Sequence, residues 1–584
     1  MTKIKAGQAL AKVLVDWKID HLYGITADSI NNTVDGLYQE RENLKYIQVR
    51  HEEIGALAAA ADAKLTGTIG VSFGSAGPGA VHLLNGLYDA KMDHVPVLAI
   101  VGQSATAIMN TNFFQEMNQD PIFADVAEFH KQVTNAEQIP YVVDEAIRSA
   151  YATHSVSVVI IPDDLSGQEI EFNNFKTASI KAIKQAIAPK AEDLHAVEQA
   201  LKAAKQPILW VGKGAFNARQ EVVAVAEKFS LPVLSTAPAT GVMPTDHPSF
   251  MGSRGRLGTK PAFEVSQAAD LVLFVGTNFP FARYLPADIK FVQVNNNLAD
   301  LGKQRDADLT VLSDAKLFLQ ALLKLDYSVA PTPFLKAAQA DKHNWDKWLQ
   351  ALAQDDHAGL RAESVMAAIK KNAAADAVFG LDVGNNTEWA IRQLPLNQQQ
   401  RFSMSAWYGT MGFGLPAGLA GKLSFPDKQN WTISGDGGFA MVMPDLLTEV
   451  KYQLPVINIV LENQVFGFIQ HEKLLAHQAP YGIDLQGADW AKAAEGLGAI
   501  GLRATNLAEL KTAMQKINQL QAADNRLPIV LAAKIKNVDP IDTSFVPVER
   551  AIFGDQMVDQ YRQQYAIAED QQPAFSQLLA KFNA

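Results

Sequence analysis

The strongest chemical signal in the sequence is an aspartate set among glycines and followed at a distance by an asparagine. Asp436 lies within Gly435-Asp436-Gly437-Gly438, directly after the apolar run 431–434, and Asn463 follows 27 residues later, after a second apolar run, 457–461. Parallel strands end at one edge of a sheet, so both side chains are expected there. A carboxylate, an amide oxygen and a backbone carbonyl, for which Val465 is the candidate, are hard oxygen ligands. They suit Mg²⁺ holding a diphosphate.

A second candidate is the acidic pair Glu52 and Glu53, which precedes the alanine-rich run 56–61. Small apolar neighbours provide the low-dielectric surroundings in which a carboxyl group can keep and share a proton. Taken alone, the pair is also typical of the solvated start of a helix. His51-Glu52 does not form a zinc motif, because no histidine follows at Ile54 or Gly55.

The elements that must position these residues follow one pattern, which occurs three times. An apolar run ends at glycine, a helical stretch follows, and a second apolar run begins near a proline; the runs are 68–74 with 95–101, 207–212 with 231–234, and 431–435 with 454–460. The glycine-to-proline spacings of 22, 20 and 20 residues suit a βαβ unit with buried parallel strands. The pattern predicts an α/β protein with three doubly wound parallel-sheet domains, which bind ligands at the carboxyl ends of the strands.

Composition excludes several classes of function. The 584 residues contain no cysteine, which excludes disulfides, thiolate metal sites and a cysteine nucleophile. The net charge of −11 without a basic block argues against binding to nucleic acid or to anionic lipid. The uncharged stretch 402–421 is broken by glycines and a proline, which favours a buried loop and helix over a membrane span. The first 20 residues are amphipathic and lack a signal-peptide pattern, so the expected compartment is the cytoplasm.

Domain boundaries are expected where the βαβ pattern fails. The polar stretch 166–192 is typical of a linker, and the stretch 327–333 with two prolines marks a second break. We therefore expect domains at residues 1–180, 190–328 and 355–540. The glutamine-rich region 541–584 is expected to form a C-terminal arm, either as an exposed helix or as a segment that binds a partner.

Together, the Asp436–Asn463 pattern and Glu52 resemble the thiamine diphosphate (ThDP) enzymes. In that family a glutamate in the first domain contacts N1′ of the cofactor's aminopyrimidine, and Glu52 aligns with it. The resemblance makes 1–180 the pyrimidine-binding domain and 355–540 the diphosphate- and Mg²⁺-binding domain. Asp436, Asn463 and the Val465 carbonyl would hold the metal. The remaining residues implied to contact ThDP are Gly77, Gly409, Met411 as a wedge between its two rings, Gly435, Gly437 and Gly438.

Within the family, the likeness extends to the bacterial phosphate-dependent pyruvate oxidases, through the runs 46–53, 60–67, 114–118 and 466–469. It implies that residues 190–328 bind FAD. The implied flavin contacts are Gly212, Gly214, Ser235, Arg256, Gly276, Asn278, Asn295, Asp314 and Ala315. The implied catalytic residues, besides Glu52, are Phe114, Gln115, Val383, Phe468, Ile469 and Glu472.

The resemblance implies that pyruvate, phosphate and O₂ give acetyl phosphate, CO₂ and hydrogen peroxide. Because Glu52 and Asp436 belong to different domains, the family builds each site between two subunits, and a homotetramer made of two dimers is expected. Two differences from the oxidase pattern leave an alternative function, that of a non-oxidative ThDP enzyme. This enzyme would be either an acetolactate-forming enzyme or a 2-oxo acid decarboxylase. Asp28 adds a carboxylate near the expected substrate mouth, and Asn295-Asn296-Asn297 replaces the acidic residues that suit a flavin ribose. A third reading is a catalytically idle oligomeric or nucleotide-binding protein.

Overall fold

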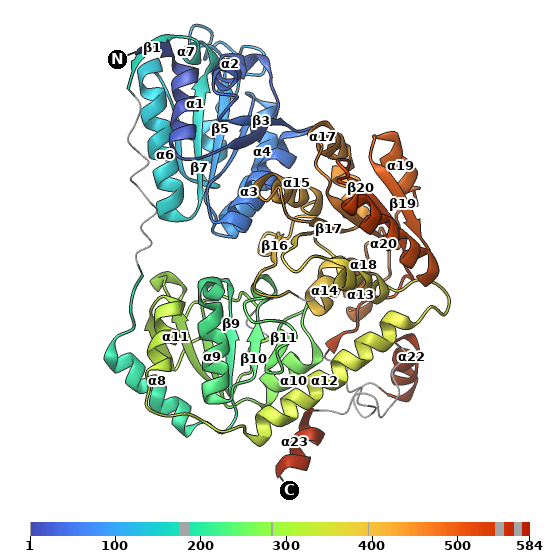
Figure 1. Ribbon diagram of the computed structural model, residues 1–584. Helices are drawn as coiled ribbons and strands as arrows, with labels where there is room; N and C mark the ends of the chain where they lie inside the picture. Colours follow the sequence, from blue (N-terminus) through green and yellow to red (C-terminus); the bar gives the residue numbers. More distant parts are fainter. Residues whose placement is uncertain are drawn as a thin grey trace.

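The computed structural model describes residues 2–173, 186–281, 284–394, 396–543, 550, 554–565 and 575–583. It shows three α/β bodies, each built on a six-stranded sheet (Figure 1). The N-terminal body is blue in the figure, the middle body is green, and the C-terminal body runs from yellow to red. The predicted fold class of three doubly wound parallel sheets is confirmed.

The N-terminal sheet has the strand order β3-β2-β4-β5-β7-β6, and each of its pairings is parallel. Its strands are β2 (His21–Gly24), β3 (Lys45–Gln48), β4 (Gly70–Gly74), β5 (Val97–Gln103), β6 (Ala127–Gln132) and β7 (Val156–Pro162). Its helices are α1 (Ala6–Asp16), α2 (Asn31–Gln39), α3 (Glu52–Thr66), α4 (Pro78–Met92), α5 (Asp120–Phe123), α6 (Ile139–Thr153) and α7 (Asp163–Ser166).

The middle sheet has the parallel order β11-β10-β9-β12-β13-β14. Its strands are β9 (Pro207–Val211), β10 (Val233–Ser235), β11 (Phe250–Ser253), β12 (Leu271–Val275), β13 (Lys290–Asn295) and β14 (Leu309–Leu312). Its helices are α8 (Ala191–Ala203), α9 (Arg219–Phe229), α10 (Lys260–Ala268) and α11 (Ala315–Leu323).

The C-terminal sheet has the parallel order β16-β15-β17-β18-β20-β19. Its strands are β15 (Val378–Leu381), β16 (Arg401–Met404), β17 (Asn430–Gly435), β18 (Ile457–Glu462), β19 (Ile500–Ala504) and β20 (Ile529–Lys534). Its helices are α13 (Ala362–Asn372), α14 (Asn385–Gln393), α15 (Gly414–Ser424), α16 (Asp436–Val442), α17 (Leu446–Lys451), α18 (Gly467–Leu475), α19 (Trp490–Gly496) and α20 (Leu507–Ala522).

The long helix α12 (Pro333–Gln354) precedes this body, and two helices, α22 (Asp555–Tyr565) and α23 (Phe575–Asn583), lie near the chain end. Helix α23 lies against α12, where the rings of Phe575 and Phe334 meet edge to face with centroids 5.6 Å apart (Figure 1). Much of the segment expected as a C-terminal arm, 544–549, 551–553 and 566–574, lies outside the described residues. The part that is described near the end of the chain is therefore docked on the protein.

The predicted linker 166–192 differs from the structure at its start. Residues of β8 (Glu169–Phe172) pair antiparallel with β1 (Thr2–Lys5), and Ile170 and Phe172 are buried while Glu169 and Glu171 are exposed. This alternation is typical of a strand with one covered face, and the prediction overlooked it because the run is only four residues long. Residues 174–185 of the predicted linker lie outside the described part of the chain.

Helix α3, which begins at Glu52, joins the N-terminal and C-terminal bodies through one hydrophobic core that also includes Leu415 and Leu419 of α15. The small side chains of the alanines in α3 also let this helix pack closely against α4. A Cβ added at Gly86 of α4 would lie 2.5 Å from Ala56, so the two helices meet almost backbone to backbone. The stretch 402–421 forms part of β16, a loop and part of α15. Among the described residues, no helix is long and apolar enough to cross a membrane.

A buried polar group connects β17 and β18 of the C-terminal sheet, near the beginning of both strands, to helix α17. Asn458 of β18 donates to the Glu449 carboxylate of α17 at 2.9 Å and accepts from the Thr432 hydroxyl of β17 at 2.6 Å. Glu449 is completely buried, and burial raises the pKa of its carboxyl group to about 8. The carboxyl group is therefore protonated in the folded protein at neutral pH.

We expect the free energy of unfolding to fall as the pH rises from about 4.5 to about 8, because Glu449 loses its proton earlier in the unfolded chain. One pKa unit corresponds to about 1.4 kcal/mol, so the loss approaches roughly 4 kcal/mol. Glu449→Gln should remove this contribution, whereas Glu495→Gln, at an exposed position of α19, should leave it. Urea denaturation across this pH range checks the prediction; equal pH dependence in wild type and Glu449→Gln would contradict it.

Candidate functional site

Asp436 and Asn463 leave the C-terminal sheet at the same edge. Strands β17 and β18 are parallel neighbours, with Gly435 opposite Leu461, so both side chains lie just beyond the paired residues. The Asp436 carboxylate is buried and accepts hydrogen bonds from the backbone N–H groups of Gly437, at 3.1 Å, and Gln464, at 2.8 Å. The loops after both strands thus fix its orientation, and burial raises its pKa to about 6.

The oxygen atoms at this edge fit a hard divalent cation. Asp436 supplies a carboxylate and Asn463 an amide oxygen, and the Val465 carbonyl accepts one hydrogen bond from Gly467 N–H at 2.9 Å. A carbonyl oxygen has two lone pairs, so that of Val465 keeps one for a further partner. This donor set, without sulfur or imidazole, is the one that Mg²⁺ prefers.

The glycines around Asp436 are required by close contacts. A Cβ at Gly437 would lie 2.7 Å from the Phe466 ring, and one at Gly438 would lie 2.7 Å from a carboxylate oxygen of Asp382. Larger side chains would therefore push these neighbours apart. The backbone here can approach a bound group closely.

The segment that contains Gly409 and Met411 is held by Asp382, which directly precedes the predicted catalytic residue Val383. Asp382 is completely buried at the end of β15, and its carboxylate accepts from Gly412 N–H at 2.8 Å and from Val383 N–H at 2.7 Å. Burial raises its pKa to about 6. Gly409 and Gly412 both have positive φ, 72° and 84°, which glycine adopts without strain.

One large cavity, about 2050 Å³, is lined by residues of all three bodies, and the predicted site residues that line it belong to the C-terminal and middle bodies. From the C-terminal body it is lined by these predicted residues: Val383, Gly409, Met411, Gly435, Asp436, Gly437, Gly438, Asn463, Val465, Phe468, Ile469 and Glu472. From the middle body it is lined by Gly214, Arg256, Gly276, Asn278, Asn295 and Asp314. A site for one small ligand usually encloses about 300–1,000 Å³, so this cavity has room for two.

Arg256 connects the two walls of this cavity. Its guanidinium group forms an ion pair with Glu472, donates to the Phe468 carbonyl at 3.0 Å and lies 3.4 Å from the centroid of the Phe468 ring. The middle body thus contacts helix α18, which carries three of the predicted catalytic residues.

The other middle-body candidates differ in what they offer. Asn278 donates to Asp300 at 2.7 Å, but its buried Oδ1 accepts no hydrogen bond from the described residues and can accept one from a ligand. The Asp314 carboxylate caps α11 by accepting from Lys316 and Leu317 N–H, and Asn295 donates weakly to the Thr277 carbonyl at 3.4 Å. Three predicted residues are not among the described residues that line the cavity: Gly212, Ser235 and Ala315.

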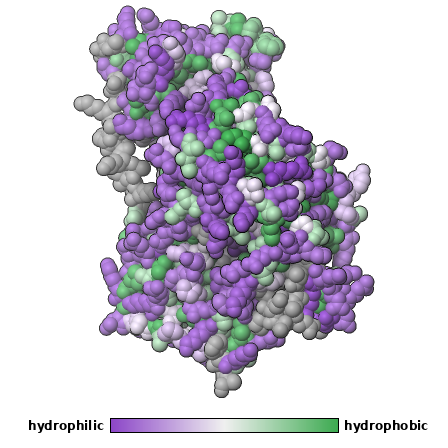
Figure 2. Space-filling model, turned by 45° about the vertical axis from the view of Figure 1, so that its right-hand side comes forward, coloured by the Kyte–Doolittle hydropathy of each residue, from purple (hydrophilic) through white to green (hydrophobic). Residues whose placement is uncertain are grey.

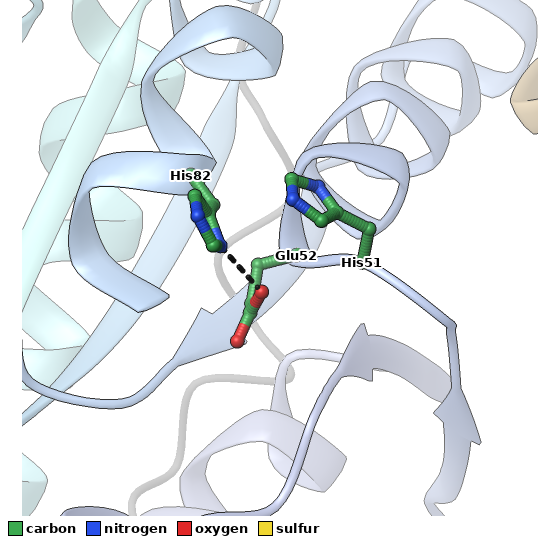
Figure 3. Close-up of side chains that lie close together, drawn as sticks. All are labelled: His51, Glu52 and His82. Carbon is green, nitrogen blue, oxygen red and sulfur yellow. Dashed lines mark hydrogen bonds and ion pairs between the residues drawn. The ribbon is translucent and has the colours of Figure 1, made fainter. Parts of the chain in front are cut away.

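Glu52 belongs to a second group of residues, on the N-terminal body. It is the first residue of α3 and is buried, and one carboxylate oxygen lies 3.0 Å from Nδ1 of His82 on α4 (Figure 3). A Cβ at Gly79 would come within 3.2 Å of the other oxygen. Gly77 lies in the loop between β4 and α4 and has a φ of 66°. A Cβ at Gly77 would lie 2.7 Å from the Gln115 carbonyl, so Gln115 lies beside this loop.

This second group is separate from the large cavity. Glu52, Gly77, Phe114 and Gln115 are absent from the described residues that line it, and the Phe114 side chain is 71% exposed. Asp28, also on this body, is exposed. The predicted site residues therefore form two separate groups within one chain. We call them the pyrimidine half-site, around Glu52, and the diphosphate half-site, around Asp436, after the parts of ThDP that the sequence resemblance assigns to them.

Sequence reasoning missed His82, although a signal was present. Helices α3 and α4 each follow a strand of the same parallel sheet, so their first turns meet at one sheet edge. A histidine in the second turn of α4 was therefore a candidate neighbour of Glu52.

Comparison with known proteins relates each of the three bodies to a domain of one enzyme family. Residues 4–122 match the N-terminal TPP binding domain of the thiamine pyrophosphate enzymes, residues 194–322 their central domain, and residues 382–531 their C-terminal TPP binding domain. The chain is 41% identical to pyruvate oxidase of Lactiplantibacillus plantarum over 98% of this chain and 95% of that protein. It is 40% identical to the putative thiamine pyrophosphate-containing protein YdaP of Bacillus subtilis, over 92% of this chain and 92% of that protein. It is 28% identical to the acetolactate synthase large subunit of Corynebacterium glutamicum, over 91% of this chain and 86% of that protein.

Proposed function

Since the chain belongs to the thiamine pyrophosphate enzymes, we propose that it is a ThDP-, Mg²⁺- and FAD-dependent pyruvate oxidase. It would convert pyruvate, phosphate and O₂ to acetyl phosphate, CO₂ and hydrogen peroxide. The observation that carries this proposal is the cavity of about 2050 Å³, in which the diphosphate half-site and the middle-body residues face the same space. The similarity to a pyruvate oxidase supports the choice of substrate.

Each cofactor has residues of suitable chemistry. Mg²⁺ and the diphosphate of ThDP would be held by Asp436, Asn463 and the Val465 carbonyl, next to glycines that admit a close backbone approach. FAD would lie against the middle body, where the unpaired Oδ1 of Asn278 can accept a hydrogen bond. When bound, ThDP supplies an electron sink for decarboxylation, and the flavin accepts two electrons.

The remaining roles belong to side chains of this protein. Glu52 would hold a proton at N1′ of the aminopyrimidine, and Met411 would keep the two rings of ThDP in a bent arrangement. Val383, Phe468 and Ile469 would exclude water around the reacting carbon, with Phe114 and Gln115 contributed by the pyrimidine half-site. Arg256, which lines the cavity and forms an ion pair with Glu472, would supply a guanidinium group that can attract phosphate.

The two half-sites imply that the working enzyme is at least a dimer. Glu52 of one subunit would face Asp436 of another, which would join the half-sites that one chain keeps apart. Exposed apolar side chains support such an interface: Val81 on α4, Met441 on α16 and Leu447 on α17 are each more than a third exposed. Figure 2 shows hydrophobic side chains gathered in the upper half of one face. A tetramer of two such dimers, located in the cytoplasm, is our proposal for the assembly.

We expect the protein purified with ample FAD to be yellow and to lose its visible flavin absorbance when pyruvate is added without O₂. Acetyl phosphate should form only when phosphate is present. Asn278→Ala should weaken flavin retention at least about tenfold, because it removes a buried acceptor, whereas Asn518→Ala, at an exposed position of α20, should not.

Absorbance spectra and assays of acetyl phosphate and hydrogen peroxide check this prediction. Acetolactate or acetaldehyde formation without any change in flavin absorbance would overturn the oxidase proposal in favour of a non-oxidative ThDP enzyme.

A further inference from the structure

The surroundings of Glu52 contain two imidazole groups that the proposed reaction does not use. His51 is the residue before α3, Glu52 begins the helix, and His82 lies on α4 (Figure 3). The two imidazole rings are stacked with centroids 4.2 Å apart, and His82 Nδ1 lies 3.0 Å from the Glu52 carboxylate. One ligand atom from each residue lies within 4.8 Å of the others.

This donor set selects a class of metal ion. Two imidazole nitrogens and one carboxylate suit ions of borderline softness, such as Zn²⁺, Ni²⁺ and Cu²⁺. Mg²⁺ prefers oxygen ligands in an octahedron and is poorly served by two nitrogens. The cluster and the oxygen site at Asp436 therefore differ in the metals they favour.

The cluster also has access to solvent and a favourable local charge. In the single chain, the side chains of His51 and His82 are 45% and 39% exposed, while Glu52 lies beneath. An ion can therefore reach them where the cofactor and the partner subunit leave the half-site open. Glu53, whose carboxylate lies 3.8 Å from His51 Nδ1, adds a second negative charge next to the cluster. The negative charges of Glu52 and Glu53 compensate the positive end of the helix dipole at the start of α3.

We propose that His51, Glu52 and His82 form a binding site for a divalent transition-metal ion, represented by Zn²⁺, and that this ion competes with ThDP. The competition rests on the proposed function, because a metal on the Glu52 carboxylate occupies the oxygen that the aminopyrimidine would need. Zn²⁺ would therefore inhibit the enzyme from the pyrimidine half-site without displacing Mg²⁺ from Asp436.

The test is calorimetric titration of the cofactor-free, full-length protein with Zn²⁺ at saturating Mg²⁺, with Co²⁺ absorbance as a second probe of imidazole ligation. We expect one Zn²⁺ per chain at this site. His51→Ala and His82→Ala should each weaken its binding at least about tenfold, since even outer partners of metal ligands are worth 10–100-fold. His195→Ala, at an exposed position of α8, is the control and should bind Zn²⁺ like the wild type.

Addition of ThDP should raise the apparent Kd for Zn²⁺ in the wild type. Unchanged Zn²⁺ affinity in both histidine variants would overturn the site, and unchanged affinity in the presence of bound ThDP would overturn the competition. Failure of the proposed function is recognised separately: ThDP binding and acetyl phosphate formation are measured without Zn²⁺. A ThDP-binding, acetyl phosphate-forming enzyme that shows no Zn²⁺ site would lose this inference alone.

Discussion

Replacing Glu52 by glutamine is expected to slow exchange of the C2 proton of bound ThDP by about 10²–10⁴, the usual contribution of acid–base assistance. Glutamine keeps the size of the side chain and can still pair with His82, but it has no carboxyl proton to share at N1′. ThDP should remain bound, because its diphosphate and metal would be held by the other half-site. Exchange into heavy water, followed by NMR after acid quenching, gives the rate.

Glu53→Gln is the matched control for this experiment. Successive side chains on a helix diverge by about 100°, and the Glu53 carboxylate accepts from Asn85, which also donates to Thr410 at 2.9 Å. A glutamine can maintain that contact, so exchange should stay close to wild type. Slow exchange in Glu53→Gln with normal exchange in Glu52→Gln would transfer the role to Glu53. Normal rates in both would count against the proposed use of ThDP.

Asp436→Asn is expected to raise the Kd for ThDP, at a fixed Mg²⁺ concentration, by about 100-fold or more. Even partners outside a metal's ligand shell contribute 10–100-fold to metal affinity, and Asp436 would be the charged ligand itself. Asparagine is nearly isosteric, and its one amide oxygen can keep one of the two hydrogen bonds from the Gly437 and Gln464 N–H groups. Removing Mg²⁺ from the wild type with a chelator should have a comparable effect, and calorimetry measures both.

Asp445→Asn provides the comparison for this loss. Asp445 is also a buried carboxyl group of the C-terminal body, with a pKa raised by burial to about 6, but it accepts from Thr448 and from Arg50 N–H. It is not among the described residues that line the cavity. We expect Asp445→Asn to change stability and to leave the Mg²⁺ dependence of ThDP binding intact. Equal losses in the two variants would show that Asp436 acts through the fold and not as a ligand.

The sequence was most informative where local pattern and topology agree. The three glycine-to-proline intervals predicted parallel strand pairs, and β4–β5, β9–β10 and β17–β18 are such pairs. Because parallel strands end together, the same pattern placed Asp436 and Asn463 at one edge. Each of these inferences needs only the chain direction and the period of buried residues.

The sequence was least informative about contacts between separate elements. The Arg256–Glu472 ion pair joins residues 216 positions apart, and the sequence around either residue contains no pattern that predicts this contact. Asp314 lines the cavity and also caps the N-terminus of α11. A sequence pattern cannot distinguish a residue that binds a ligand from one that caps a helix. The strand β8 was missed because it is only four residues long and because its partner, β1, lies at the other end of the N-terminal body's chain.

The separation of Glu52 from the cavity that contains Asp436 has a genetic consequence. Two alleles that each inactivate the enzyme, Glu52→Gln and Asp436→Asn, are expected to rescue one another in the same cell. In a mixed dimer with sites shared between subunits, one site receives both substitutions and the other receives neither. Random pairing makes half of the dimers mixed, so about a quarter of the wild-type sites should return. Two alleles altered within the same half-site would show no such rescue.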